Sequence, residues 1–408
     1  MSSSRIIPSI AKLPHKSILE LTGPDSQKFL KGLSCKDVDS LKGGYSGFLN
    51  ASGRVLHTTF IFPISSSRYL VSHESNENNH PSPLQTFLPP FKLRAKVKIR
   101  DVSDQWDTYA SWGQDLEQDN NNNNNNNVNQ KGKGKGKQPD RIWKFGSGGA
   151  SESQYHWENN EPRDLELSEK EIGCWDLRAG WGINSLGRQI LVPKGDQPSL
   201  TSSHDLTSTE SYHLKRMILG VPEGPDEIIP GHALPLESCM DLHGGVDFRK
   251  GCYLGQELTV RTYHTGATRK RILPIRLIPL NKGGSLSDYI HPASSSSSSD
   301  PSVLSGGIDI GGDLDITYHP PSSAPSKKSR SAGKILTLKG SIGLGLVRLE
   351  MAERSWWSND ISNLSIKDWQ DNNNNIDIGK LTTQIGDETY GVYVDKGEAY
   401  REALKHMS

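Results

Sequence analysis

Short runs of alternating hydrophobic and polar residues fill the first part of the chain. Residues 17–23, Ser-Ile-Leu-Glu-Leu-Thr-Gly, alternate as a strand does, and residues 24–33 start with a proline and place their apolar side chains at helical spacing. Residues 43–63 contain two apolar runs on either side of Asn-Ala-Ser-Gly at 50–53, a turn-forming sequence. The pattern predicts a strand, a short helix and a β-hairpin.

The same alternation continues, with interruptions, toward the C-terminal end. A helix from residue 84 meets two prolines at 89 and 90 and gives way to a strand at 94–102, and another helix is predicted at 211–219. The remaining predicted strands lie at residues 67–72, 272–280, 333–351 and 388–395. Short strands mixed with short helices predict an α+β fold.

Three polar segments interrupt this pattern and divide the chain. An asparagine homopolymer and a Lys-Gly repeat lie within residues 113–168, and sequence rich in Gly, Ser, Asp, Pro or Asn occupies about 281–331 and 358–376. Such segments offer too few apolar side chains to form a core, so all three are predicted to be disordered insertions. We therefore expect a body at residues 17–278 and a C-terminal domain at 279–402.

Residues 1–16 have the composition of a short mitochondrial presequence. They contain Arg5, Lys12 and Lys16, several serines and no acid. An ordinary disordered N-terminus has the same composition, and the prolines at positions 8 and 14 disfavour an amphipathic helix. The residues alone leave both interpretations open.

Composition and charge exclude several classes of protein. The 408 residues contain equal numbers of acidic and basic side chains, which argues against broad nucleic-acid binding. No apolar run reaches the roughly 18 to 20 residues that span a bilayer. The four cysteines are far apart and include no C-x-x-C pair, so the sequence predicts no permanently bound metal or iron–sulfur cluster.

The chemistry of the sequence is concentrated at residues 248–271, FRKGCYLGQELTVRTYHTGATRKR. Residues 254–263 have helical spacing, so Cys252 falls just before a predicted helix N-terminus, where the helix dipole and the nearby Arg249 and Lys250 favour a thiolate. The predicted consequence is a reactive, partly exposed cysteine. The alternative is a small apolar core residue, which is what most free cysteines are.

Two residues of the predicted helix have a second, purely structural interpretation. Glu257 and Arg261 stand four positions apart with the acid first, a spacing that supports a helix by a few tenths of a kcal/mol. Gly251 and Gly255 bracket the cysteine, and glycine suits a backbone with positive φ or one that approaches a ligand closely. The segment therefore resembles a loop shaped around a ligand.

The motif KGCYLGQE at residues 250–257, followed by RTYHTG at 261–266 and RKR at 269–271, resembles the signature of the YgfZ family. These proteins are folate-binding relatives of the glycine-cleavage T-protein, and their mitochondrial members assist maturation of 4Fe–4S proteins. Residues 174–192 also resemble the central strand pair of that family. The resemblance covers most of the chain outside the polar segments.

The resemblance implies a fold, a location and partners. The fold would be a pseudo-symmetric α+β body around a central hole for tetrahydrofolate, with a small C-terminal β-barrel. The location would be the mitochondrial matrix. The partners would be A-type iron–sulfur scaffold proteins and 4Fe–4S client apoproteins of the aconitase and lipoate-synthase types, with Cys252 as the essential group.

Tetrahydrofolate has a flat pterin, which needs an apolar slot and an acid or amide, and an anionic tail, which needs cations. The folate-binding residues suggested by the resemblance are Lys250, Tyr253, Gln256, Glu257, Arg261 and Asn50. Arg269 and Arg271 could also contact the tail, although a solvated basic surface explains them equally well.

The leading rival is a tetrahydrofolate-dependent aminomethyltransferase or demethylase. T-proteins present an acidic side chain in the hairpin at residues 43–63, whereas this hairpin offers Asn50, Ser52 and His57 but no Asp or Glu. Without a carboxylate, general-base chemistry at that point lacks its usual group. A third possibility is a binding module without chemistry that recruits A-type scaffold proteins.

Two further residue sets were weighed. Asp241, His243 and Asp247 combine metal-ligating residue types, but their spacing is irregular and no other ligand is near in sequence, so no metal site is predicted. Arg178 and Arg188 could line an anion pocket or could be solvated charges on strands.

Overall fold

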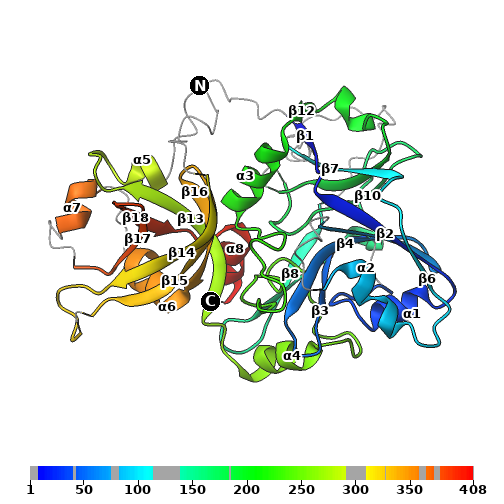
Figure 1. The fold of residues 1–408 in the computed structure, drawn as a ribbon, viewed down its shortest axis with the longest axis horizontal. Helices are drawn as coiled ribbons and strands as arrows, with labels where there is room; N and C mark the ends of the chain where they lie inside the picture. The colour runs from blue at the N-terminus through cyan, green and yellow to red at the C-terminus, as the bar shows by residue number, and fades with distance from the viewer. Residues whose placement is uncertain are drawn as a thin grey trace, which may run out of the picture.

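The computed structural model describes residues 8–39, 43–74, 82–113, 138–182, 185–290, 309–326, 328–357, 364–371 and 377–407. Two five-stranded sheets form the body, and a closed barrel forms the C-terminal domain (Figure 1). The asparagine homopolymer, the Lys-Gly repeat and the first seven residues lie outside the described residues. No helix of the described residues is long and apolar enough to cross a membrane.

The first sheet has the strand order β10-β11-β7-β1-β12. Its strands are β1 (Ser9–Lys12), β7 (Trp106–Trp112), β10 (Ile172–Trp175), β11 (Arg188–Pro193) and β12 (Asp205–Thr207), and α3 (Thr209–Leu219) and a 3-10 turn (Ser199–Ser202) follow nearby in the chain. The β10–β11 pair confirms the strand pair expected at 174–192.

The assignment of residues 1–16 to a presequence is wrong from Ser9 onward. β1 pairs with β7 on one side and with β12 on the other. Ile10 and Ala11 are fully buried in this position. The basic residues of this stretch concealed the strand. Lys12 is the last residue of the strand, and its ammonium pairs with Asp107 at 2.9 Å.

The second sheet has the order β3-β4-β5-β2-β6. Its strands are β2 (Lys16–Thr22), β3 (Gly44–Leu49), β4 (Val55–Ser65), β5 (Arg68–Glu74) and β6 (Lys98–Asp101), and its helices are α1 (Ser26–Lys31), α2 (Leu84–Phe87) and a 3-10 turn (Pro89–Phe91). The predicted hairpin is confirmed as β3–β4. The apolar side chains predicted on α1 pack in the core of this sheet.

The predicted disordered insertion at 113–168 is wrong for the described residues 138–168. β8 (Asp140–Phe145) and β9 (Ser151–His156) form an antiparallel hairpin, followed by a 3-10 turn (Glu158–Asn160). The start of β9, Ser151 to Ser153, is fully buried. The neighbouring polar repeat dominated the composition of the segment and concealed two strands.

The barrel closes in the order β13-β16-β15-β14-β17-β18. Its strands are β13 (Lys270–Pro279), β14 (Asp309–His319), β15 (Arg330–Lys339), β16 (Ile342–Arg348), β17 (Lys380–Ile385) and β18 (Glu388–Val394). Its helices are α5 (Ser287–Ile290), α6 (Leu349–Ala352), a π-helical turn (Glu353–Trp357), α7 (Ile366–Asp371) and α8 (Glu398–Met407).

Three sequence boundaries change in the barrel. β13 is a barrel strand, so this domain begins at Lys270 and not at residue 279. The predicted disordered insertion at 281–331 contains α5 and β14, and the one at 358–376 contains α7. In α7, Trp369 is buried and stacks on Trp356 with ring centroids 5.4 Å apart.

A buried ion pair joins β13 to the body. Both guanidinium Nη atoms of Arg271 donate to the carboxylate oxygens of Asp241 at 2.9 Å, and they also donate to the carbonyl oxygens of Leu236 at 2.8 Å and Gly149 at 2.9 Å. Both side chains of the pair are fully buried. Arg271 is therefore neither a solvated charge nor a folate-tail ligand, and Asp241 is engaged by a cation of the chain.

Replacing Arg271 by Ala leaves the Asp241 carboxylate buried without its partner, a change that costs about 3–5 kcal/mol of stability. We expect the midpoint of thermal unfolding to fall clearly. The matched control is Arg269→Ala, since this arginine lies two positions earlier and is exposed. Equal midpoints for the two variants would contradict this role of the ion pair.

Candidate functional site

Cys252 lies in an exposed loop that leads into α4 (Gln256–Thr265). The helix N-cap is Gly255, three residues after the cysteine, and it has a left-handed backbone with φ 77°. The predicted position of Cys252 before a helix is therefore confirmed within two residues. Because Cys252 is exposed, the alternative of a core cysteine is wrong.

The other three cysteines are buried. Burial raises the pKa of the Cys35 thiol to about 12 and that of Cys239 to about 11, and it also raises the pKa of Cys174. A thiol without access to the thiolate form is chemically inert. Among the four cysteines of the chain, Cys252 is the one that solvent and a partner protein can reach.

The β3–β4 turn packs directly against the start of α4. Gly53 and Gly255 face each other, both with left-handed backbones at φ 79° and 77°. A Cβ at Gly255 would lie 2.2 Å from the Asn50 carbonyl oxygen, so a side chain cannot fit there. The Oδ1 atom of Asn50 accepts hydrogen bonds from the backbone N–H groups of Ser52 and Arg54, each at 3.0 Å. Asn50 thus lies beside the signature segment, and its side chain organises the turn.

Lys250 anchors the signature loop through the hydrogen bonds of its ammonium group. Its ammonium donates to the carbonyl oxygens of Lys31 at 2.7 Å, Ser34 at 2.6 Å and Lys36 at 3.3 Å. It also lies 4.7 Å from the centre of the Tyr253 ring, and burial lowers its pKa to about 8. The three N–H groups of this ammonium therefore donate to the last residue of α1 and to the segment that follows it.

The other predicted folate-binding residues divide into buried and exposed groups. Tyr253 is 6% exposed, and its backbone N–H donates to Oε1 of Gln256 at 3.3 Å. The Tyr253 hydroxyl has no hydrogen-bond partner among the described residues. Glu257 and Arg261 are exposed on α4, and within the described part of the chain no ion pair joins them.

A polar cluster that the sequence did not predict lies behind the signature loop. It contains Lys36, Glu152 and Asp247, whose charges act on one another, and Tyr253, on which the charge of Asp247 acts. Burial raises the pKa of the Glu152 carboxyl, and Asp247 raises it further, while Lys36 acts in the opposite direction. Glu152 Oε1 accepts from the Gln154 amide at 2.7 Å, and Glu152 Oε2 has no partner among the described residues.

Glu152 was missed because it lies in the segment that was predicted to be disordered. The signal that could have identified it is the alternation of aromatic and polar residues in Arg-Ile-Trp-Lys-Phe at 141–145 and Gln-Tyr-His-Trp at 154–157. Asp247, whose charge acts on Glu152, stands out in the sequence only as a residue of metal-ligating type. Asp247 Oδ1 accepts from the backbone N–H of Arg249 at 3.0 Å.

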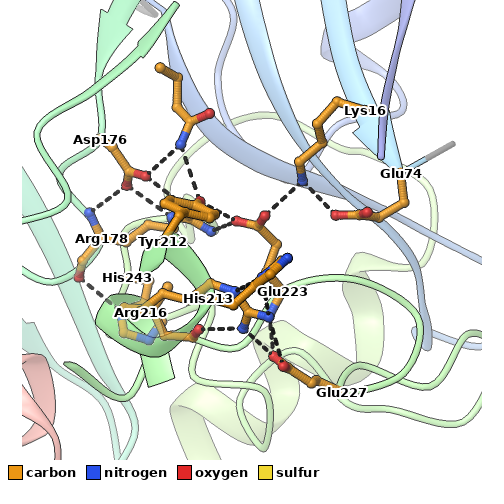
Figure 2. Close-up of polar contacts among 12 residues, drawn as sticks. Lys16, Glu74, Asp176, Arg178, Tyr212, His213, Arg216, Glu223, Glu227 and His243 are labelled. Atoms are coloured by element: carbon orange, nitrogen blue, oxygen red, sulfur yellow. Dashed lines mark hydrogen bonds and ion pairs between the residues drawn. The ribbon is translucent and has the colours of Figure 1, made fainter. Parts of the chain in front are cut away.

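A second polar cluster is a buried ion network between the two sheets (Figure 2). The ammonium of Lys16 contacts Glu74 at 2.5 Å and Glu223 at 2.8 Å. Although burial alone would lower it, these two carboxylates raise the pKa of Lys16. His15, Glu74 and Glu223 lie close enough together to ligate a metal, but the Lys16 ammonium already binds both carboxylates.

Arg178 is part of the same buried ion network. Its guanidinium pairs with Asp176 at 2.6 Å and with Glu223 at 2.5 Å, and it also donates to the Tyr212 hydroxyl at 2.9 Å. Arg178 and Arg188 are both fully buried, and Arg188 lies 4.6 Å from the centre of the Trp175 ring. The interpretation as solvated strand charges is wrong for both.

Histidines in and beside the network are held by the protein itself. Burial lowers the pKa of His213 to about 3 and that of His15 to about 4, with nearby cations contributing. His213 Nδ1 accepts from the Arg216 Nε–H at 3.2 Å, which fits a neutral ring. His243, a residue of metal-ligating type like Asp241 and Asp247, has its ring nitrogens 2.8 Å and 3.0 Å from the carbonyl oxygens of Arg178 and Gly220. The ion network is therefore a structural element of the fold.

Comparison with solved structures supports the fold. The structure is similar to glycine cleavage system aminomethyltransferase T from Bartonella henselae, with a TM-score of 0.55, 10% sequence identity, and coverage of 97% of this chain and 87% of that chain. The family model of the CAF17 C-terminal beta-barrel domain matches residues 269–370, which agrees with a barrel that begins at Lys270.

Comparison with curated sequences gives the family. The chain is 60% identical over 403 residues to a protein of Cryptococcus neoformans var. neoformans serotype D named "Iron-sulfur cluster assembly factor IBA57 homolog, mitochondrial", with 98% of each chain covered. A protein of the same name from Aspergillus oryzae is 33% identical over 368 residues, covering 84% of this chain and 70% of that protein. The chain therefore belongs to the IBA57 branch of the YgfZ family.

Proposed function

We propose that this protein is an assembly factor for 4Fe–4S proteins of the mitochondrial matrix and that the thiol of Cys252 is the group essential for this function. The names of its relatives support iron–sulfur cluster assembly and a mitochondrial location. The observation that carries the role of the cysteine is its exposure on an anchored loop, while the three other thiols are buried.

Cys252 offers one thiolate ligand, and this number limits its chemistry. A 4Fe–4S cluster is held by four ligands, and the other cysteines of the chain are buried. A cluster or iron ion bound at Cys252 must therefore take its remaining ligands from another protein. This requirement fits transient ligation in a complex with an A-type scaffold protein or a client apoprotein.

We further propose tetrahydrofolate as a ligand of the polar cluster behind the loop. A pterin is a flat ring with hydrogen-bond donors and acceptors along its edge, and tetrahydrofolate, when bound, would supply a carrier of one-carbon units. Glu152 Oε2 and the Tyr253 hydroxyl are buried and lack partners among the described residues, so both could bind such a ring. Gln256 and Glu257 lie at the start of α4, and Asn50 lies in the β3–β4 turn. All three remain predicted folate contacts.

The anionic tail of the folate would need cations near the surface. Arg261 stays the predicted tail contact, and Arg249 is exposed beside the signature loop. Lys250 is less suited to this role, because its N–H groups already donate to three backbone carbonyl oxygens.

The second candidate is a folate-dependent aminomethyltransferase, which the likeness to aminomethyltransferase T favours at the level of fold. The β3–β4 hairpin offers no carboxylate for that chemistry. Its Asn50 Oδ1 accepts from the turn backbone, and His57 Nε2 lies 2.7 Å from the Ser82 carbonyl oxygen. We therefore place assembly ahead of aminomethyl transfer.

The role of the thiol is tested in cells whose own gene is replaced by the Cys252→Ser form. We expect aconitase and lipoate-dependent dehydrogenase activities to fall to the level of cells that lack the protein, because serine is a poor ligand for iron and does not form disulfides. A 2Fe–2S enzyme should keep its activity. His264→Gln, an exposed change on α4, is the matched control. Normal aconitase activity with Cys252→Ser would refute the proposal.

Folate binding is tested by titrating the purified full chain with tetrahydrofolate under anaerobic conditions. Glu152→Gln and Tyr253→Phe should each weaken binding by about tenfold or more, since each removes a hydrogen bond made in a buried place. Glu169→Gln, an exposed change, should leave the affinity unchanged. If both site variants bind as tightly as the unchanged protein, folate does not occupy this cluster.

A further inference from the structure

A pocket of about 200 Å³ lies between α4 and the first strand of the barrel. Its walls are the segment 234–237, one face of α4, the connection 267–270 and Arg348 at the end of β16. Its lining includes no member of the polar cluster behind the signature loop and none of Lys250, Tyr253, Gln256, Glu257, Arg261 and Asn50; it does include Arg269, which the sequence allowed as a contact of the folate tail. In Figure 1, α4 lies at the edge of the body, below β3.

The size and the apolar wall of the pocket suit one small organic group. Leu234, Pro235, Leu236 and Leu258 form the apolar part. An apolar cavity of about 150 Å³ is enough to bind benzene. The pocket therefore has room for about one ring together with a small polar substituent.

The charges of the lining have one dominant sign. Arg269, Lys270 and Arg348 are cationic, and Glu237 is the acid of the described lining, so the lining carries a net charge of three minus one, or +2. Lys270 and Arg348 are direct cross-strand partners on β13 and β16. Like charges in that arrangement repel each other. Within the described residues, no ion pair or side-chain hydrogen bond engages any of the three cations.

Two buried threonine hydroxyls in the pocket wall also favour a bound ligand. Thr259 and Thr268 line the pocket, with 2% and 8% of their surface exposed, and their Oγ1 atoms have no partner among the described residues. By contrast, the neighbouring Thr262 donates to the Leu258 carbonyl oxygen at 2.8 Å, as a threonine on a helix commonly does. Buried hydroxyls are normally satisfied, so these two leave donors for a ligand.

We propose that this pocket binds a small organic anion with an apolar body of about one ring and a carboxylate or phosphate group. The acid group would relieve the repulsion between Lys270 and Arg348 and accept from the threonine hydroxyls, and the apolar body would contact Leu234 and Leu258. The site is separate from Cys252 and does not depend on the proposed assembly function.

The test is calorimetric titration of the full chain with phenyl phosphate, benzoate, benzyl alcohol and inorganic phosphate. We expect phenyl phosphate, benzoate or both to bind with a dissociation constant of about 1 mM or below, and the last two probes to bind at least about tenfold more weakly, because each has only half of the required chemistry. The stronger of the two acids identifies the preferred anionic group.

Variants locate the binding. The double change Lys270→Gln with Arg348→Gln should weaken binding of the preferred probe by about tenfold or more, whereas Arg330→Gln, an exposed change on β15, should not. Thr259→Val should weaken binding several-fold without lowering the thermal midpoint of the free protein, since it removes an unpartnered hydroxyl at constant volume. The Cys252→Ser protein should bind the probe with unchanged affinity.

Either of two results would overturn this inference. One is the absence of binding by both acids up to about 10 mM, which is weaker than any useful site of this size. The other is equal affinity of the unchanged protein and the Lys270→Gln, Arg348→Gln protein, which would place the probe elsewhere.

Discussion

The shape of the signature loop depends on a half-buried ammonium, that of Lys250. Moving a charged ammonium out of water costs several kcal/mol unless its hydrogen bonds are replaced. Lys250 replaces them with three backbone carbonyl oxygens, those of Lys31, Ser34 and Lys36. Carbonyl groups from the end of α1 and from the segment after it therefore converge on this ammonium, and the signature loop is fixed against them. Cys252, two residues further on, is held at the surface.

Other parts of the chain support the same loop. The β3–β4 turn meets the start of α4 at Gly53 and Gly255, where neither residue tolerates a side chain. At the far end of α4, the turn of the β8–β9 hairpin is bound through the Ser147 N–H to the Tyr263 carbonyl oxygen at 2.7 Å. The helix is therefore held at both ends by hairpins from earlier parts of the sequence. Such a support suits a thiol that must meet a partner in one fixed orientation.

Local features of this fold could be predicted from the sequence, whereas features set by distant partners could not. The β3–β4 hairpin, α1 and α4 follow from turn residues and apolar spacing within a few positions. The burial of Arg271 and Arg178 does not. Arg271 depends on the distant Asp241, and Arg178 depends on the distant Glu223 as well as on the nearby Asp176. A cation in a sequence is normally exposed, and its burial becomes visible only with the acid beside it.

The elements that were missed lie beside atypical composition. β8, β9 and β14 adjoin polar or repetitive segments, and β1 lies in a stretch with basic residues and prolines. In the candidate site, the motif points to Cys252 and Tyr253, whereas Glu152 lies on β9, a strand that the composition of its segment concealed. The contacts of Lys250 could not be predicted, since the carbonyl oxygens that accept from its ammonium have no signature in the sequence.

The most direct test of this account is the aconitase activity of cells that carry Lys250→Met with Cys252 unchanged. We predict a folded protein whose cells lose aconitase activity as cells without the thiol do, because the loop no longer has its anchor. Lys28→Met, an exposed change on α1, should support full activity. Full aconitase activity with Lys250→Met would show that Cys252 works without the anchored loop and would contradict the account.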